Sequence, residues 1–304
     1  MNNSVAAIVV TYNRKALLGE CVDCLMRQTP DPPDILVIDN ASTDGTGEAL
    51  APLIDSGAIR YENTGRNLGG AGGFQHGMRR AVELGYEYLW VMDDDAMPSP
   101  TALSALMDAA RALGDFGFLS SRALWTDGTA CRMNRQRDLK MNNIADYSQK
   151  RVPCGAATFV SLLVPARVVR RVGLPIGAFF IWADDLEYTR RISRRFPCYV
   201  ITDSVITHKC PTNNGGNIST DEVSRIERYR YAYRNEVYVY RREGPRGFMR
   251  LALRTPLHIL RVLARAPSHR LRRIGVILGG TLRGLSFRPE IEYVDDDTKS
   301  GGVQ

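Results

Sequence analysis

The first ninety residues alternate short apolar runs with segments of helical spacing, and this alternation restricts the chain to few folds. The runs at 5–10, 34–39, 58–63 and 86–92 have strand character, and three of them are nearly unbroken apolar runs, as in strands covered on both faces. Between them lie helical patterns such as "KALLGECVDCLMRQ". Strands separated by helices at this spacing predict an α/β fold with a parallel, doubly wound sheet.

The glycine-rich segment 65–73, "GRNLGGAGG", interrupts the alternation, and we expect a loop that leads into a helix from Phe74. Close approach of the backbone to a ligand would explain Gly69 and Gly70. Arg66 would supply positive charge near phosphate groups. A flexible surface loop is the alternative.

Acidic residues follow the predicted strands at the edge where open α/β sheets bind ligands. Asp93, Asp94 and Asp95 come directly after the fourth strand, where carboxylates are costly unless a cation neutralises them. Such oxygen ligands suit Mg²⁺ or Mn²⁺, which would stabilise a departing diphosphate as a Lewis acid, although Asp pairs also cap helices. His208 ends a later strand and is either structural or a further ligand of Mn²⁺.

Two other acidic positions have alternative interpretations. Asp39 at the end of the second strand suits the imide N–H of uracil or thymine, or else an Asx-turn with Asn40. Asp184 and Asp185 follow Trp182, whose ring would give a sugar an apolar face. A partly desolvated carboxylate there suits a general base, whereas the alternative is a helix N-cap with an acidic first turn.

The net charge of +7 is concentrated near the C-terminus, since residues 223–288 contain sixteen Arg, three Glu and no Lys. This asymmetry indicates a polyanionic partner such as nucleic acid, an anionic membrane or a phosphorylated substrate. No stretch reaches the ~18 to 20 apolar residues of a membrane span. The six Cys form no disulfide framework, so we expect reduced thiols and a cytoplasmic protein. A second acidic triplet at 295–297 lies in a polar tail, where we expect a solvated chain end.

Taken together, the motifs resemble family-2 glycosyltransferases with the GT-A fold, and above all the bacterial galactofuranosyltransferases and related rhamnosyltransferases of surface polysaccharides. The resemblance implies a nucleotide-sugar-binding fold with a mixed, mostly parallel sheet, a UDP- or dTDP-sugar donor, a divalent metal and inverting transfer. The matching motifs are "VVTYNR" (9–14), "VIDNASTDGT" (37–46), "NLGGAGGF" (67–74), "MDDDA" (92–96), "WADDLEYTRR" (182–191) and His208.

The resemblance also implies a role for each matching residue. The metal ligands would be Asp93, Asp95 and His208, and the catalytic base would be Asp185, with Asp184 as the alternative. The residues that would contact the donor are Thr11, Tyr12, Arg14, Asp39, Arg66, Asn67, Gly69, Gly70, Asp94 and Trp182.

We therefore expect a GT-A catalytic domain at 1–222, an Arg-rich helical region at 223–290 and a polar tail at 291–304. The helical region mixes Arg with Leu, Ile and Val, as helices lying on an anionic membrane do, although packing on the catalytic domain or on a second subunit is the alternative. The expected enzyme is peripheral on the inner face of the plasma membrane.

The expected donor is UDP-galactofuranose, or alternatively dTDP-rhamnose, and the acceptor a lipid-linked or growing glycan. A nucleotidyltransferase of the same fold is one rival, but its glycines would follow the first strand. A nucleic-acid-binding protein is a rival of another class, which the acids at the ligand edge disfavour because they repel phosphates unless a metal is present.

Overall fold

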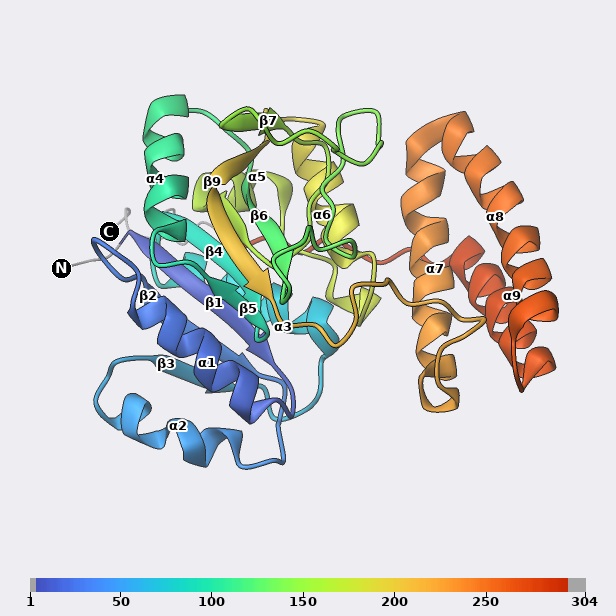
Figure 1. Cartoon of the computed structure of the whole chain (residues 1–304), viewed down its shortest axis with the longest axis horizontal. Coiled ribbons are helices and arrows are strands. Elements are labelled where there is room, and N and C mark those ends of the chain that lie inside the picture. The colour runs from blue at the N-terminus through green and yellow to red at the C-terminus, as the bar shows by residue number, and fades with distance from the viewer. Residues whose placement is uncertain (1–3, 295–304) are drawn as a thin grey trace, which may run out of the picture.

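A nine-stranded mixed sheet forms the centre of the structure, a computed structural model that describes residues 4–294. The strands are β1 (Val5–Thr11), β2 (Asp34–Asp39), β3 (Arg60–Asn63), β4 (Tyr88–Asp93), β5 (Ala96–Pro98), β6 (Leu119–Trp125), β7 (Arg151–Pro153), β8 (Leu162–Pro165) and β9 (Tyr199–His208). Their order is β3-β2-β1-β4-β8-β6-β9-β5, with β7 paired to β9 (Figure 1). Strands β1 to β4 pair in parallel, as do β6 and β9, whereas β5, β7 and β8 run antiparallel to their neighbours. The predicted mixed, mostly parallel sheet is confirmed. The second acidic triplet, Asp295–Asp297, lies outside the described residues.

Helices cover both faces of this sheet, as the alternating pattern predicts. Those of the α/β part are α1 (Lys15–Met26), α2 (Thr46–Asp55), α3 (Gly69–Glu83), α4 (Ala102–Leu113), α5 (Ala166–Val172), the short η1 (Gly177–Phe179) and α6 (Asp184–Ser193). The Arg-rich region is helical apart from short connections and stands beside the α/β part (Figure 1). It consists of η2 (Val223–Arg228), α7 (Tyr229–Tyr240), η3 (Arg241–Glu243), α8 (Gly244–Arg265) and α9 (Arg270–Ser286).

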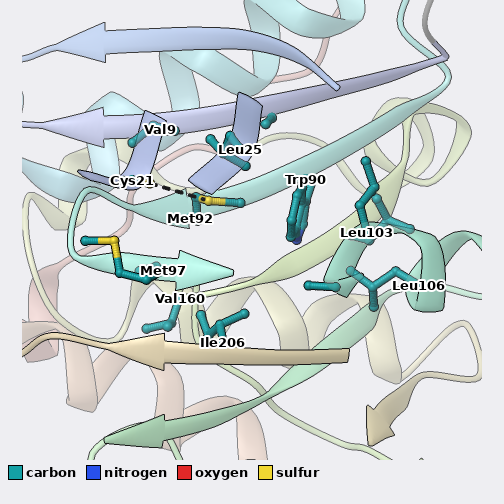
Figure 2. Close-up of a cluster of buried hydrophobic side chains, with 14 of the residues drawn as sticks. Val9, Cys21, Leu25, Trp90, Met92, Met97, Leu103, Leu106, Val160 and Ile206 are labelled. Carbon is teal, nitrogen blue, oxygen red and sulfur yellow. Dashed lines mark hydrogen bonds between the residues drawn. The ribbon is translucent and has the colours of Figure 1, made fainter. Parts of the chain in front are cut away.

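Alternate residues of β1 point into two separate apolar cores. Val9 belongs to the core under α1 and α4, together with Trp90 and Met92 (Figure 2). Ile8 belongs to the core under α3, α5 and α6, together with Phe74. Every residue of β1 is buried, which accounts for its unbroken apolar sequence.

Helix α3 begins within the glycine-rich segment, so the prediction of a loop over 65–73 is wrong for its second half. The reason is close packing of the helix on the sheet. A Cβ at Gly73 would lie 2.5 Å from Cγ1 of Val10, and one at Gly77 would lie 2.6 Å from Cγ2 of Ile8. Glycine is therefore required on the face of α3 that meets β1, despite its low helix propensity.

Strand β5 has no counterpart among the sequence predictions, because three residues give no readable period. It follows the acidic triplet directly and pairs antiparallel with β9, which places Ala96 opposite His208. This pairing brings the end of β4 next to the end of β9, two segments that lie far apart in the sequence.

The helical region packs on the α/β part through α7 and exposes much of α8 and α9. Tyr238 and Val239 of α7 share an apolar cluster with Ala71 and Phe179. Beyond α9 the chain returns to the α/β part, where the Leu174 N–H donates to the carbonyl of Glu292 (2.8 Å). Across residues 4–294, none of the helices combines the length and the apolar character needed to span a membrane.

Candidate active site

The predicted site residues converge because their strands end at one edge of the sheet. Thr11 ends β1, Asp39 ends β2, Asp93 ends β4 and His208 ends β9. The parallel pairing of β1 with β2 and β4 places the first three side by side. The pairing of β5 with β9 adds His208. This is the edge at which open α/β sheets bind ligands.

Charged and polar side chains of the chain itself partner the acidic triplet. Thr11 donates its hydroxyl hydrogen to Oδ2 of Asp94 (2.7 Å). Arg14 donates through Nη1 to Oδ1 of Asp94 (3.2 Å) and to Oδ2 of Asp95 (2.5 Å). Nε2 of His208 lies 2.9 Å from Oδ1 of Asp95. Arg14 therefore supplies part of the positive charge that buried carboxylates require.

Asp93, Asp95 and His208 could hold a divalent cation. One ligand atom from each lies within 4.8 Å of the other two. Two carboxylates and an imidazole suit Mn²⁺ and are acceptable to Mg²⁺, which prefers oxygen. The other nitrogen of His208, Nδ1, lies 2.8 Å from Oδ1 of Asn134, the kind of outer partner that orients a metal-binding imidazole. The residues present therefore fit the metal that the family resemblance implies.

The pKa values of these groups reflect burial and mutual repulsion. Burial, then the charge of Asp95, raises the pKa of Asp93 to about 8. Burial also raises the pKa of Asp94 to about 6 against the opposing charge of Arg14. Burial disfavours ionisation of Asp95 as well, but the hydrogen bond and charge of His208 outweigh it, so its pKa lies below the usual range. Because burial opposes the ionisation of Asp93 and Asp94, an additional cation would stabilise the charged forms of these carboxylates.

Asp39 is buried and already has two partners within the chain. Tyr61 donates its hydroxyl hydrogen to Oδ2 (2.5 Å), and the Ser42 N–H donates to Oδ1 (2.8 Å). The Ser42 bond closes a turn, so a structural role related to the predicted Asx-turn exists, although the partner is Ser42 and not Asn40. Each carboxylate oxygen has a second lone pair, so the partners leave capacity for a base N–H.

The other predicted donor contacts differ in exposure. Tyr12 and Arg66 are exposed, and the side chain of Asn67 accepts a hydrogen bond from the Gly69 N–H (2.8 Å). Gly69 has a φ of +72°, and a Cβ there would lie 2.1 Å from the carbonyl oxygen of Phe180. The close backbone approach expected at Gly69 is thus to Phe180. Gly70 by contrast faces open space.

The segment before α6 adopts a strained backbone. Phe180, Trp182 and Ala183 have φ values of 64°, 68° and 65°, a region that residues other than glycine rarely occupy. Strain of this kind concentrates at functional sites. It turns the chain sharply, so that Asp184 and Asp185 enter the first turn of α6. The predicted acidic first turn is present, whereas Ala183, not an Asp, occupies the N-cap position.

Asn235, which is not among the residues predicted from the sequence, holds this strained segment in place. The side chain is buried on α7 and donates through Nδ2 to the carbonyl oxygens of Phe179 (2.9 Å), Ile181 (3.1 Å) and Trp182 (2.9 Å). An Asn inside "ERYRYAYRNEVYVYRR" carries no signal of this role, because its partners lie more than fifty residues earlier. Helix α7 thus supports the loop that carries the candidate base.

Asp184 and Asp185 have different surroundings. Burial and the adjacent charge of Asp185 raise the pKa of Asp184 far above its usual range, and Asp93 adds to the effect. Burial raises the pKa of Asp185 to about 6, opposed by a hydrogen bond from the Leu186 N–H and the charge of Arg137. At neutral pH Asp185 is therefore the member of the pair that is ionised.

Asp185 lines a cavity of about 590 Å³ between the α/β part and the helical region. Trp182 lines it too, and its ring packs on Tyr229 with the centroids 4.8 Å apart. Several cations face the same cavity, namely Arg135, Arg137, Arg254 and Arg261. A second groove of about 850 Å³ shares Arg137, Arg254 and Arg261 and continues along α8. The site therefore combines an acidic edge with a basic cavity.

An α/β sheet that gathers acids at the carboxyl ends of its strands, beside a cavity, is the architecture of the GT-A glycosyltransferases. Solved structures confirm this fold. The complex of S. aureus TarS 1–349 with UDP has a TM-score of 0.56 and 14% identity, covering 93% of this chain and 72% of that chain. The mannosyltransferase PcManGT from Pyrobaculum calidifontis, solved with GDP-Man and Mn²⁺, has a TM-score of 0.53 and 16% identity, covering 94% and 76%.

The chain belongs to glycosyl transferase family 2, whose model matches residues 6–163. Galactofuranosyltransferase GlfT1 of Mycolicibacterium smegmatis is 30% identical over 266 residues, which cover 81% of this chain and 85% of that protein. The N-acetylglucosaminyl-diphospho-decaprenol L-rhamnosyltransferase of Mycobacterium tuberculosis is 23% identical over 287 residues, 84% and 90% of the two chains. The protein is therefore a glycosyltransferase, and the resemblance read from its motifs is confirmed.

Proposed function

We propose that this protein is a metal-dependent, inverting glycosyltransferase that moves galactofuranose from UDP-galactofuranose to a lipid-linked or growing glycan of the bacterial cell surface. The observation that carries the proposal is the convergence of Asp93, Asp95 and His208. Besides burial, the charge of Asp93 also raises the pKa of Asp184, which adjoins the candidate base Asp185. The similarity to a galactofuranosyltransferase over four-fifths of the chain supports the choice of sugar. The less similar rhamnosyltransferase makes dTDP-rhamnose the alternative donor.

In the proposed complex, the donor lies along the carboxyl ends of β1, β2 and β4. Asp39 recognises the base, and Thr11, Tyr12, Arg66, Asn67, Gly69 and Gly70 line the nucleotide and diphosphate. Arg14, which contacts Asp94 and Asp95, would also supply positive charge to the diphosphate. Asp94 then faces the donor, and Trp182 faces the sugar.

Asp93, Asp95 and His208 would hold Mn²⁺ or Mg²⁺. When bound, such an ion supplies Lewis-acid stabilisation of the negative charge that develops on the departing diphosphate. The charges of the site support this assignment, because Arg14 and His208 face three carboxylates, and burial together with the charge of Asp95 raises the pKa of Asp93 to about 8.

The proposed reaction is a single displacement. The carboxylate of Asp185 accepts the proton of an acceptor hydroxyl, whose oxygen attacks the anomeric carbon from the face opposite the nucleotide. The bond between that carbon and the diphosphate oxygen breaks with its electron pair going to the diphosphate, which inverts the configuration. Asp184, which burial keeps protonated, is the less suitable base. Positioning by the chain contributes much of the barrier reduction.

We further propose that the basic cavity receives the acceptor. Arg137, Arg254 and Arg261 line both the cavity of Asp185 and the groove along α8, so a diphosphate bound there would meet several cations. The groove is also lined by apolar residues of α8, including Leu253 and Leu257. Such a surface suits an acceptor that carries a diphosphate and a lipid chain.

The exposed face of α8 is the proposed membrane contact. The residues Met249, Leu253, Leu257 and Leu260 recur at helical spacing, and each is 46% to 67% exposed. Arg246, Arg250 and Arg265 are exposed on the same helix. Apolar side chains flanked by Arg are suited to the surface of an anionic bilayer, where each nearby cation adds about 1 kcal/mol. The protein would then act as a peripheral enzyme on the cytoplasmic face of the membrane.

The proposed domain organisation is a catalytic domain at 1–222, the helical region at 223–290 and a tail at 291–304. Assembly into a homo-oligomer is compatible with this organisation.

A screen of donor hydrolysis tests the proposed function. The full chain is incubated with UDP-galactofuranose, other UDP-sugars and dTDP-rhamnose, with Mn²⁺, with Mg²⁺ or with a chelator. We expect release of UDP from UDP-galactofuranose only when a divalent cation is present. Faster release from dTDP-rhamnose would select the alternative donor, and turnover unaffected by the chelator would contradict metal dependence.

A further inference from the structure

A second group of potential metal ligands lies directly behind the candidate active site. Cys131, Cys210 and His208 are all buried, and one ligand atom from each lies within 4.8 Å of the other two. Sγ of Cys131 lies 3.7 Å from Nδ1 of His208. All six cysteines of the chain are free thiols, so both sulfurs are available as ligands.

We propose that Cys131, Cys210 and Nδ1 of His208 form a binding site for a thiophilic divalent ion such as Zn²⁺. Two ligands of one tetrahedral zinc are about 3.5 to 3.8 Å apart, given Zn–S bonds of ~2.3 Å and Zn–N bonds of ~2.0 Å. The sulfur–nitrogen distance therefore fits without rearrangement. Two thiolates and an imidazole prefer Zn²⁺ and Cd²⁺ to the Mg²⁺ or Mn²⁺ suited to the acidic site.

Asn134 offers a fourth ligand atom. Its Oδ1 lies 3.0 Å from Sγ of Cys131, which donates to it, and 2.8 Å from Nδ1 of His208. The oxygen thus already faces Cys131 and His208, and the Asn134 side chain is buried. On binding, each thiol and Nδ1 of His208 release a proton to solvent, and the two sulfurs and the nitrogen coordinate the ion.

The backbone holds the two cysteines in place independently of any metal. The Cys131 N–H donates to the carbonyl of Ala123 on β6 (3.1 Å). The indole of Trp125 donates to the carbonyl of Cys210 (3.0 Å). Both thiols are therefore fixed to the end of β6, next to His208 at the end of β9. A preorganised set of ligands loses less conformational entropy on binding than a flexible one.

The two metal sites compete for one imidazole, an inference that rests on the proposed function of the acidic site. A neutral imidazole has a single lone pair and carries its proton on the other nitrogen. An ion on Nε2 leaves the proton on Nδ1, where it is donated to Asn134. An ion on Nδ1 leaves the proton on Nε2, where it is donated to Asp95. A thiophilic ion therefore removes His208 from the acidic site and acts as an inhibitor.

Titration of the metal-free full chain with Cd²⁺ tests the site without reference to activity. Thiolate coordination gives an ultraviolet charge-transfer band, whereas Cd²⁺ bound only to carboxylates and imidazole does not. We expect the band to saturate at one ion per chain. Cys131→Ser and Cys210→Ser should each weaken binding more than about 100-fold, because even an outer partner of a ligand is worth about 10- to 100-fold.

Cys24→Ser is the matched control, since Cys24 belongs to no group of potential metal ligands among the described residues. The Cd²⁺ affinity of this variant should equal that of the unmodified chain. Circular dichroism of each variant establishes folding, and either cysteine variant alone decides the question if the other fails to fold. Absence of the band in the unmodified chain, or a Cd²⁺ affinity in the folded cysteine variants equal to that of the unmodified chain, would overturn the site. Prior addition of Mn²⁺ should raise the apparent dissociation constant for Cd²⁺, and no change would overturn the competition.

Discussion

At the scale of single residues, the most specific functional hypothesis is that Asp185 is the general base. Its carboxylate lines the cavity, and the adjacent Asp184 is buried and interacts with Asp93. We predict that Asp185→Asn lowers kcat by about 10²- to 10⁴-fold, the usual contribution of a general base. Titration calorimetry with UDP and Mn²⁺ should give a dissociation constant within a few fold of the unmodified enzyme. Full turnover of Asp185→Asn combined with loss of activity in Asp184→Asn would transfer the assignment to Asp184.

The pKa of Asp185 also predicts a pH dependence. Burial raises this pKa to about 6, and a base acts in its ionised form. The rate at saturating donor and acceptor should therefore be constant above pH 6 to 7 and fall about tenfold per unit at lower pH. Arg137 lowers this pKa by its charge, so Arg137→Gln should move the acid limb to higher pH. A limb that does not move would show that another group controls it.

Much of the candidate site follows from the sequence because parallel strands end at a common edge. Thr11, Asp39 and Asp93 are readable in this way, since each follows an apolar run. The partners of these residues are not readable, because Asn134 and Asn235 come from segments without periodicity or with a helical pattern typical of any surface helix. Their roles depend on tertiary contacts that no local pattern encodes.

At the scale of elements, α3 shows how packing can override helix propensity. Its glycines suggest a loop, yet they let the helix approach β1 more closely than an alanine would permit. We predict that Gly77→Ala destabilises the fold by about 1 to 3 kcal/mol, because its Cβ would meet Ile8 and Ile38 at 2.6 and 2.9 Å. Denaturant unfolding measures this free energy.

Gly19→Ala on α1 provides the matched control for Gly77→Ala. Gly19 is also inside a helix, but a Cβ there would have no neighbour within 4 Å. Alanine should leave the free energy of unfolding unchanged or raise it by up to about 1 kcal/mol, through its higher helix propensity. Equal effects of the two substitutions would contradict the packing argument.

Helix α7 offers a test of the support that it gives to the strained loop. Asn235→Ala removes three hydrogen bonds to the loop carbonyls, which leaves buried acceptors unsatisfied at a cost of about 1 to 3 kcal/mol. We predict a fall in kcat with little change in UDP affinity, because Asp185 loses its position while the donor residues keep theirs. Thr281→Val on α9 is the control, since its hydroxyl donates to the carbonyl of Ile277 in its own helix. Equal kcat values in the two variants would refute the supporting role.

Long periodic elements were predicted well, and short or glycine-rich ones were not. The runs that became β1, β2 and β4 are apolar over a whole strand, and a buried parallel strand has no other pattern. The three residues of β5 carry no period, although this strand determines where His208 lies. Its existence depends on pairing with β9, which is a property of the folded chain.

At the scale of the whole molecule, the exposed face of α8 predicts a lipid-dependent location. Substituting Leu253, Leu257 and Leu260 together by Gln should reduce co-sedimentation with anionic liposomes, because their apolar area no longer enters the bilayer. Met26→Gln is the control, since Met26 is exposed on α1, remote from α8. High salt should weaken binding of the unmodified chain through screening of its Arg residues. Equal recovery of all three proteins with the liposomes would reject membrane docking.

The return of the chain after α9 has a mechanical consequence. The helical region is joined to the α/β part by residues 209–222 at its beginning and by residues 287–294 at its end, where Arg79 and Leu174 hold Glu292. A unit attached at one point can rotate about that point, whereas a unit attached at two points can turn only about the line between them. The packing of Tyr238 and Val239 on Ala71 and Phe179 opposes this remaining rotation and so limits changes in the width of the cavity that Asp185 lines. We therefore expect an acceptor of the proposed kind to enter and leave along α8 while the two parts stay in place.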